Sequence, residues 1–417
     1  MNTYNQVSLA TSSLSLAATK TIQVNTITAN YIALFCAKND YSLIYIRFKQ
    51  TYAALAATCI AICMMAMMSW GAVYAASTDP IPPSTTAVKW HPGHYFTLYS
   101  SNKDNPNYLA RVYSDLKATS ALRGAQIRYE WADLETAKGV YDFTAIDARL
   151  AELAAIEKRL VIMIQTKSFS LDTALVPDYL KTSAYEGGVF TYASANKDQE
   201  GQNIKLWNSM VRDRMIALIR ALGKRYNSHP YFEGIGLTET AMGQPVIALT
   251  STQVDGYYAN LLSINKKMRE HFPNTMTFQF TNYPRPLLES FINGLKEMGT
   301  ALGGPDTFIE EPGLHYTGTP KGVYNYYPVL SGIIPMTPSV MPGNYRNTRV
   351  DGTGYEPTVS ELLAFARDKL KANYIFWHRD VGYYPQVLEM LNWSEQTSDP
   401  AGGLNPACPT AYSSCIN

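Results

Sequence analysis

The sequence predicts an α/β protein whose main domain, residues 77–393, is a closed (β/α)8 barrel, the TIM-barrel fold. Short apolar runs with strand character recur eight times, and amphipathic helical patterns lie between them. Strands that alternate with helices indicate parallel βα units, and eight such strands in about 300 residues indicate closure into a barrel. No glycine-rich phosphate loop follows the first run, which disfavours a dinucleotide-binding sheet.

Each expected element has its own pattern. The helices are predicted where apolar residues recur three and four positions apart, at 108–118, 145–159, 210–226, 254–272, 286–298 and 360–371. The expected strands are His94–Leu98, Ala125–Tyr129, Leu160–Gln165, Gly234–Leu237, Met276–Phe280, Thr300–Gly304, Gly332–Met336 and Tyr374–Trp377. Their order along the chain is the order that a parallel barrel requires.

The composition excludes some classes of protein. The 35 Lys and Arg residues balance 34 Asp and Glu, for a net charge of +1, which gives no electrostatic reason to expect a nucleic acid or an acidic membrane surface as partner. Hydrophobic residues make up 46% and charged residues 17%, enough apolar material for a large core. The 30 tyrosines either fill that core or stack on the apolar faces of a ligand.

The N-terminal part is predicted to lie outside the fold. At 47–76, Arg47 and Lys49 precede the uncharged run "TYAALAATCIAICMMAMMSWGAVYAA", which ends in small residues suited to cleavage after Ala75. This is the pattern of a secretory signal peptide, although the run is also long enough for a membrane anchor. Residues 1–46 have no usable pattern, and a start codon assigned too early is the simplest account. We expect a secreted or periplasmic protein without stable membrane insertion.

The cysteines agree with export. After cleavage only Cys408 and Cys415 remain, in a tail, 394–417, that is rich in Ser, Pro, Gly and Asn. Two cysteines this close together indicate one small disulfide in an oxidising compartment, the alternative being two unpaired thiols.

The candidate site follows from the fold, because the active sites of such barrels lie at the carboxyl ends of the strands. The residues at those ends form a polar and aromatic ring that a hydrophobic scaffold does not need. They are Tyr99, Ser100, Arg128, Glu130, Trp131, Lys167, Glu239, Asn282, Tyr283, Asp306, Pro338, Ser339, Trp377, His378 and Arg379.

Two carboxylates in this ring are the catalytic candidates. Glu239 ends the apolar run of "YFEGIGLTETA", and a carboxylate in a partly dry pocket can serve as a general acid. Asp306, in "LGGPDTFIEEPG", is the expected second carboxylate, and Glu310 and Glu311 follow closely. The alternatives are a salt-bridged or helix-capping Glu and a turn Asp. Carboxylates that face each other across a barrel mouth are what glycosidic cleavage requires.

The other ring residues fit a sugar cleft, in which aromatic rings stack on sugar faces and charged groups bind hydroxyls or a carboxylate. The candidate substrate-binding residues are Arg128, Glu130, Trp131, Lys167, Trp377 and His378. A tryptophan at a strand end is equally compatible with a plug of the barrel core. The chain has no G-x-S-x-G elbow, and Pro92 and Gly93 keep His91 and His94 off a common helix face. We therefore expect neither a metal nor a cofactor.

The stretch "IRYEWADLETAKGVYDFTAIDARL" resembles the second-strand segment of clan A glycoside hydrolases, especially family 42 β-galactosidases and cellulase-like barrels. The residues that match in order are Arg128, Trp131, Leu134, Glu135, Gly139, Tyr141, Asp142, Phe143, Asp147 and Leu150. The resemblance extends loosely over residues 90–393. It implies that Glu239 is the acid/base and that Trp377 is the aromatic residue at the end of strand eight.

The sequence departs from this family at two places. Thr238 stands where the family usually has Asn, and "GIIPMTPSVMPGNY" has no carboxylate where the family has its nucleophile. If Asp306 is the partner, inversion through a water becomes possible. Glu310 or Glu311 could instead be the nucleophile. The function predicted is hydrolysis of O-glycosidic bonds in a poly- or oligosaccharide. The alternatives are a non-catalytic carbohydrate-binding barrel and a polysaccharide lyase.

Overall fold

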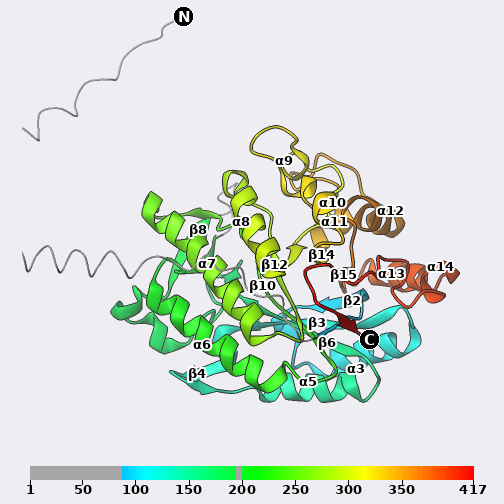
Figure 1. Ribbon diagram of the computed structural model, residues 1–417, viewed down its shortest axis with the longest axis horizontal. Helices are drawn as coiled ribbons and strands as arrows, with labels where there is room; N and C mark the ends of the chain where they lie inside the picture. The colour runs from blue at the N-terminus through cyan, green and yellow to red at the C-terminus, as the bar shows by residue number, and fades with distance from the viewer. Residues whose placement is uncertain (1–86, 194–199) are drawn as a thin grey trace, which may run out of the picture. The chain divides into compact units, whose positions relative to one another are not determined.

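The computed structural model describes residues 87–193 and 200–417 (Figure 1). The predicted signal peptide and the extension before it lie outside the described residues. Within them, no helix is long and apolar enough to cross a membrane.

Eight parallel strands close into a barrel, so the protein is a (β/α)8 barrel, as the sequence predicts. Every strand hydrogen-bonds to the next in chain order, and the last, β15, pairs with the first, β2. The barrel strands are β2 (Gly93–Leu98), β3 (Leu122–Glu130), β6 (Arg159–Gln165), β10 (Phe232–Leu237), β12 (Met276–Phe280), β13 (Ala301–Gly304), β14 (Met336–Val340) and β15 (Tyr374–His378).

Helices cover the outside of the barrel, and α6, α7 and α8 lie side by side along one flank (Figure 1). Capping residues set several of the helix ends: the Asn208 side chain accepts bonds from two amides at the start of α6, and Gly299, with a φ of 72°, ends α8. The outer helices are α3 (Pro106–Ala118), α5 (Thr144–Ala154), α6 (Ser209–Tyr226), α7 (Ser251–His271), α8 (Arg285–Met298), α12 (Val359–Ala364) with the π-helical turn Phe365–Lys369, and α13 (Tyr384–Leu391).

Two apolar layers follow from the alternation of side chains along each strand. One layer fills the barrel interior and includes Tyr95, Met163, Phe278 and Phe376. The second lies between the strands and the helices. Glycines on β10 make room inside, because a Cβ at Gly236 would lie only 2.3 Å from the ring of Phe278.

The seventh strand is not where the sequence predicts it. Gly332–Met336 was expected, but β14 spans Met336–Val340 and pairs with β13 through Leu302 and Met336. Gly332 has a φ of 78° in a turn, and Ile334 is buried beneath β14 in a separate apolar cluster. The apolar run is therefore a packed turn, and the more polar "MTPSV" is the strand.

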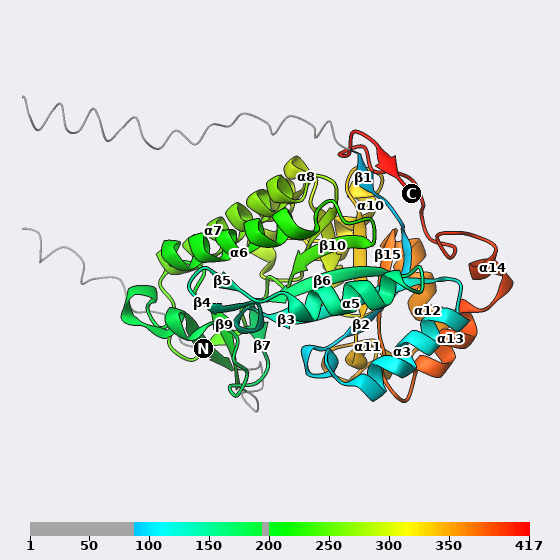
Figure 2. The ribbon, with the colours of Figure 1, turned by 90° about the horizontal axis from the view of Figure 1, so that it is seen from below.

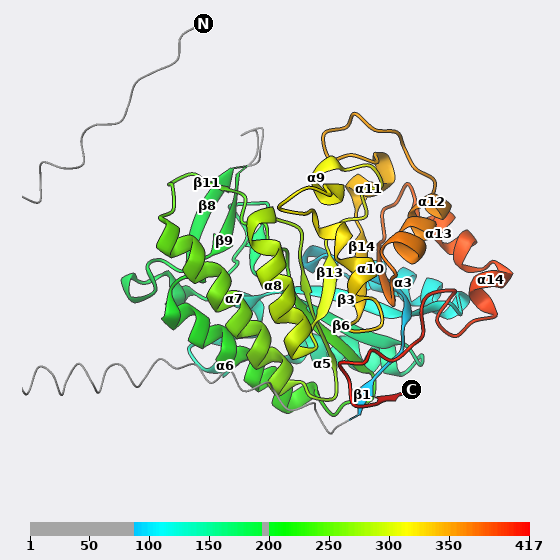
Figure 3. The ribbon, with the colours of Figure 1, turned by 45° about the horizontal axis from the view of Figure 1, so that its top comes forward.

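The connections at the carboxyl ends of the strands carry extra structure. After β6, the chain forms β7 (Lys167–Ser168), two 3₁₀ turns (Asp178–Lys181 and Ser183–Tyr185), β8 (Val189–Ala193) and β9 (Glu200–Ile204), and β11 (Gln244–Pro245) joins β8. Figure 2 and Figure 3 show this small sheet apart from the barrel wall. Short helices replace a regular helix after β13 and begin the connection after β14, namely α9 (Pro312–His315), the 3₁₀ turn Val323–Asn325, α10 (Tyr327–Leu330) and α11 (Pro342–Arg346).

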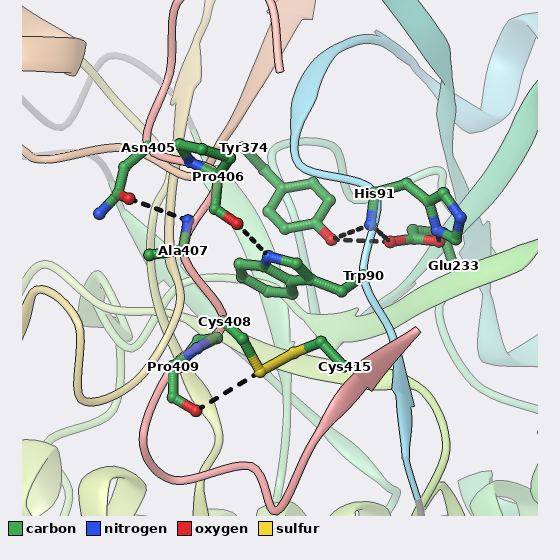
Figure 4. Close-up of a disulfide and its surroundings, with 10 residues drawn as sticks. All are labelled: Trp90, His91, Glu233, Tyr374, Asn405, Pro406, Ala407, Cys408, Pro409 and Cys415. Atoms are coloured by element: carbon green, nitrogen blue, oxygen red, sulfur yellow. Dashed lines mark hydrogen bonds and ion pairs between the residues drawn. A yellow bond between two sulfur atoms is a disulfide. The ribbon is translucent and has the colours of Figure 1, made fainter. Parts of the chain in front are cut away.

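The tail packs near the opposite, amino-terminal end of the barrel, where Tyr412 joins the apolar cluster of the barrel interior. After α14 (Ser394–Thr397) it runs to β16 (Cys415–Ile416), which pairs with β1 (Val88–Lys89) beside the barrel (Figure 3). Cys408 and Cys415 form a disulfide, as predicted (Figure 4). Trp90 Nε1 donates to the Pro406 carbonyl at 2.8 Å, so a hydrogen bond joins the tail to the segment before β2, whereas the disulfide closes a loop within the tail (Figure 4).

The segment that carries the family resemblance is largely scaffold. After β3 the chain forms α4 (Trp131–Leu134) and a hairpin of β4 (Glu135–Ala137) and β5 (Val140–Tyr141). The completely buried Glu135 accepts bonds at 2.7 Å from Trp131 Nε1 and from the Gly139 amide, and it forms an ion pair with Arg214. This buried carboxylate fixes the turn, which explains several of the matching residues without involving a ligand.

Candidate active site

The carboxyl ends of the barrel strands open into a cavity of about 590 Å³, which is within the usual size of a ligand site. An adjoining cavity of about 400 Å³ lies beside it. Four residues line both cavities: Lys167, Phe169, Glu239 and Asp306. The two carboxylates singled out in the sequence thus lie at the junction of the two cavities.

Glu239 follows β10 and is held by donors on both of its oxygens. Lys167 Nζ donates to Oε1 and Asn282 Nδ2 donates to Oε2, each at 2.7 Å. The side chain of Glu239 is 13% exposed and that of Lys167 is 6% exposed. Both oxygens of Glu239 therefore accept a hydrogen bond, and the one from the ammonium of Lys167 is charge-assisted.

Asp306 follows β13 and has a different environment. Burial, together with the nearby Glu239 carboxylate, raises the pKa of Asp306 to about 7. Its Oδ1 accepts one long hydrogen bond from Asn344 Nδ2, at 3.3 Å, and this opposes the rise. Among the described residues, no Lys, Arg or His nitrogen lies within 4.0 Å of Asp306. A carboxyl group in this setting can hold a proton near neutral pH and release it to a substrate.

Arg128 and Glu130 point into the first cavity because they alternate along β3 with Ile127 and Tyr129, which pack against the helices. Glu130 accepts bonds from the Ser100 hydroxyl and, at 2.7 Å, from Gln165 Nε2. Burial raises the pKa of Glu130. The guanidinium of Arg128 lies over the ring of Tyr99, 5.2 Å from its centre.

Neither tryptophan predicted to stack on a sugar reaches the cavity, so that expectation is wrong for both. Trp131 and Trp377 are completely buried. Trp377 belongs to the layer between strands and helices because its neighbour Phe376 points into the barrel, and its Nε1 donates to His94 Nδ1 at 3.0 Å. His378 does not line the cavity either. Its ring packs against Tyr99 with the two ring centres 4.5 Å apart.

The aromatic walls of the cavities come from other residues. Phe169 is 60% exposed and lines both cavities, and Tyr192 on β8 lines the second. Lys167 Nζ lies 4.9 Å from the centre of the Phe169 ring and 4.7 Å from that of Tyr192. An exposed ring beside two carboxylates is a surface on which a sugar face can stack. Sequence analysis missed Phe169 although it lies only two residues beyond Lys167.

The other carboxylates considered for the chemistry lie farther out. Glu310 is on the outer loop, where it accepts a bond from the Thr348 hydroxyl at 2.6 Å, and it lines neither cavity. Glu311 lines only the second cavity and accepts a bond from the Val350 amide at 3.0 Å. At the end of β14 stands Met341, whose sulfur atom lies 3.5 Å from Arg128 Nη2. Asn344, which the sequence did not reveal, comes from the short helix that follows.

Thr238, the other departure from the family pattern, is held from both sides, by residues of the two strands that flank β10 or just beyond them. The Thr166 amide donates to its hydroxyl at 3.0 Å, and Gln279 Nε2 donates to its carbonyl at 2.5 Å. In the part of the chain that the structure describes, no group of three or more His, Cys, Asp or Glu side chains is arranged to hold a metal ion.

The fold and the site together define a (β/α)8 barrel with two differently held carboxylates in a polar and aromatic cavity at its carboxyl-terminal end. No protein-family model and no curated protein matches the chain. Among solved structures it is similar to the catalytic domain of a β-amylase from Paenibacillus polymyxa, at 8% identity over 70% of this chain and 93% of that chain, with a TM-score of 0.48.

It is also similar to a β-galactosidase from Bacillus circulans sp. alkalophilus, at 11% identity over 69% of this chain and 50% of that chain, with a TM-score of 0.47. For endo-glycoceramidase II from Rhodococcus sp. the identity is 13%, over 71% of this chain and 76% of that chain, with a TM-score of 0.43. None of these likenesses assigns an activity to this chain.

Proposed function

We propose that this chain is a glycoside hydrolase that cleaves O-glycosidic bonds of a poly- or oligosaccharide with Asp306 and Glu239 as its catalytic pair. One observation carries the proposal: the two carboxyl groups share one cavity, yet they are held differently. Glu239 accepts hydrogen bonds from Lys167 and Asn282, whereas Asp306 is buried with a single long hydrogen bond from Asn344. Two carboxyl groups in one cavity with such different surroundings are typical of an acid paired with a base or nucleophile.

The sequence suggests Glu239 as the general acid and Asp306 as the second carboxylate. The surroundings of the two side chains favour the opposite assignment. Asp306, with a pKa raised to about 7, would protonate the glycosidic oxygen as its bond to the sugar breaks. Glu239, which Lys167 and Asn282 hold with donors on both oxygens, would remove a proton from the attacking water or would itself attack the sugar. The first route inverts the configuration at the reacting carbon, and the second retains it.

The two adjoining cavities support a substrate with sugar units on both sides of the cleaved bond. The pair stands where the cavities meet, so a glycosidic bond placed there would have a unit on either side. Phe169 offers its exposed ring to both, and Glu130 and Gln165 supply hydrogen-bonding groups in the first. Export is part of the proposal, since a disulfide and the predicted signal peptide both favour an oxidising compartment.

The test is hydrolysis of a panel of poly- and oligosaccharides by the full chain, with products identified by mass spectrometry. On a cleaved substrate, Asp306→Asn and Glu239→Gln should each lower kcat by about a hundredfold to ten-thousandfold. Glu310→Gln, at a carboxylate that lines neither cavity, is the matched control that should retain activity, and Glu311→Gln tests the alternative carboxylate. If Glu311→Gln were inactive and Asp306→Asn active, the assignment of Asp306 would be wrong.

A second candidate is a barrel that binds a carbohydrate without cleaving it. The observation in its favour is Met341 at the end of β14, near the position where the family resemblance implies a nucleophilic carboxylate. This function predicts calorimetric binding of an oligosaccharide and no product after prolonged incubation with the wild-type chain.

A further inference from the structure

Arg128 is a buried cation that has no anionic partner in the part of the chain that the structure describes. Its side chain is 8% exposed, and its Nε has no hydrogen-bond partner. Nη2 reaches only the sulfur of Met341, a weak acceptor, at 3.5 Å. Among the described residues, no carboxylate oxygen lies within 4.0 Å of this guanidinium.

Other arginines that pack into the fold are matched to acceptors. Arg379, which is 5% exposed, donates twice to Asp115, at 2.6 and 3.1 Å. Arg214 forms an ion pair with the buried Glu135, and Arg269, which is 7% exposed, donates to three backbone carbonyls. Because burying an unpaired charge is costly, the exception at Arg128 points to a partner other than the residues that the structure describes, such as a bound ligand.

The neighbours of Arg128 do not neutralise it. Tyr99 offers a ring face, and burial, with Arg128 itself adding to the effect, lowers the pKa of His378 to about 4, so the imidazole is neutral. Glu239 and Asp306 attract the guanidinium from a distance, but Glu239 is already bonded to Lys167. Lys167 in turn uses two of its three donors on Glu239 and on the Ala241 carbonyl, whereas the only acceptor that Arg128 reaches among the described residues is the weak one on Met341.

We propose that Arg128 binds the oxyanion of an acidic sugar, the carboxylate of a uronic acid or a sulfate ester, and so selects an anionic glycan as substrate. The inference rests on the proposed function, because it names the substrate class of the same cavity. A guanidinium presents a planar fork of N–H donors that matches such an oxyanion with two parallel hydrogen bonds. Arg128 lines the cavity together with Asp306 and Glu239, so the acidic unit would lie next to the catalytic pair.

The test is calorimetric binding to the full chain of glucuronate, galacturonate, mannuronate and sulfated-galactan oligosaccharides, each beside the unsubstituted oligosaccharide of the same backbone. At least one acidic ligand should bind tenfold or more tightly than its neutral parent. Arg128→Met should remove at least tenfold of that affinity and leave the neutral parent unaffected. The uronate and sulfate arms distinguish the two sources of the oxyanion. Arg111→Met, at an exposed site on α3, is the control for loss of one positive charge.

The melting temperature of the Arg128 variants distinguishes a role in ligand binding from a role in holding the fold together. Removing an unpaired buried cation should leave the melting temperature of Arg128→Met equal or raised, whereas a structural arginine would lower it. If the Met variant does not fold, Arg128→Lys keeps the charge without the fork and should still lose affinity for the acidic ligand alone. The inference is overturned if no acidic ligand binds more tightly than its neutral parent, or if the variants weaken acidic and neutral ligands by the same factor.

The same ligands keep this inference distinct from the proposed function. Cleavage of neutral oligosaccharides without preference for acidic ones contradicts the role of Arg128 but still supports the proposed glycoside hydrolase activity. Tight binding of an acidic ligand that is never cleaved contradicts the proposed glycoside hydrolase activity but still supports the role of Arg128 in binding. Release of an unsaturated product that absorbs in the ultraviolet supports the role of Arg128 and replaces hydrolysis by elimination.

Discussion

Replacing Asp306 by Asn should stabilise the protein in a pH-dependent way. Its pKa rises from an ordinary 3.8 to about 7 in the folded state. Between these values the folded chain holds a proton that the unfolded chain has released, so the free energy of unfolding falls as the pH rises. About three pH units at 1.36 kcal/mol each give ~4 kcal/mol, and solvent access to the side chain reduces this to about 2–4 kcal/mol.

The quantity to compare is the difference in the free energy of unfolding between Asp306→Asn and the wild type, measured as a function of pH. Below about pH 3 the carboxyl is protonated in both states, so Asp306→Asn and the wild type should be equally stable. Above pH 7 the Asn variant should be more stable by the full amount. Urea unfolding at a series of pH values measures this, with Asp255→Asn, at an exposed position on α7, as the control for a lost carboxylate. A difference that is the same at pH 3 and pH 8 would refute the raised pKa.

Further predictions concern activity, the tail, the scaffold and the buried tryptophan. The kcat/KM for a cleaved oligosaccharide should fall as the pH rises through about 7, since Asp306 must carry a proton, and a rise across that pH would contradict its acid role. Cys408→Ser should lower the free energy of unfolding by about 2.5 kcal/mol, because the disulfide closes a loop between residues seven apart, and unchanged urea unfolding would contradict this. Glu135→Ala should cost about 3–5 kcal/mol by leaving Arg214 unpaired, and a stability change below 1 kcal/mol would show that the pair is not structural. Trp377→Phe should leave KM unchanged, whereas a large rise in KM would place this ring in the site.

The fold was predictable because the barrel repeats one pattern. Apolar runs that alternate with amphipathic helices specify parallel βα units, and closure follows from their number. The prediction failed at β14, where burial depends on neighbouring strands rather than on local hydrophobicity. "MTPSV" becomes a strand because β13 and β15 flank it, and the Ser339 hydroxyl donates to the Phe376 carbonyl at 3.1 Å. The more apolar residues just before it pack in a turn.

The site was predictable as a set of strand ends, but less so residue by residue. Side chains alternate between the two faces of β3, so Arg128 and Glu130 point inward and Trp131 does not. This rule alone would have removed the Trp131 ring from the predicted site. The functions of the carboxyl groups depend on tertiary contacts that no local pattern encodes. Asn282, just after the end of β12, donates to Glu239. Asn344, on α11 in the connection that follows β14, donates to Asp306. The raised pKa of Asp306 depends in the same way on burial and on Glu239.

The dependence of rate on the leaving group tests the catalytic pair most directly. Two substrates with the same sugar are compared, one with a nitrophenol leaving group, which departs without protonation, and one with a sugar leaving group, which needs it. We predict that Asp306→Asn loses far more activity on the second substrate than on the first, while Glu239→Gln loses activity on both. Equal losses for Asp306→Asn on both substrates, or selective loss for Glu239→Gln, would contradict the assignment of Asp306 as the acid.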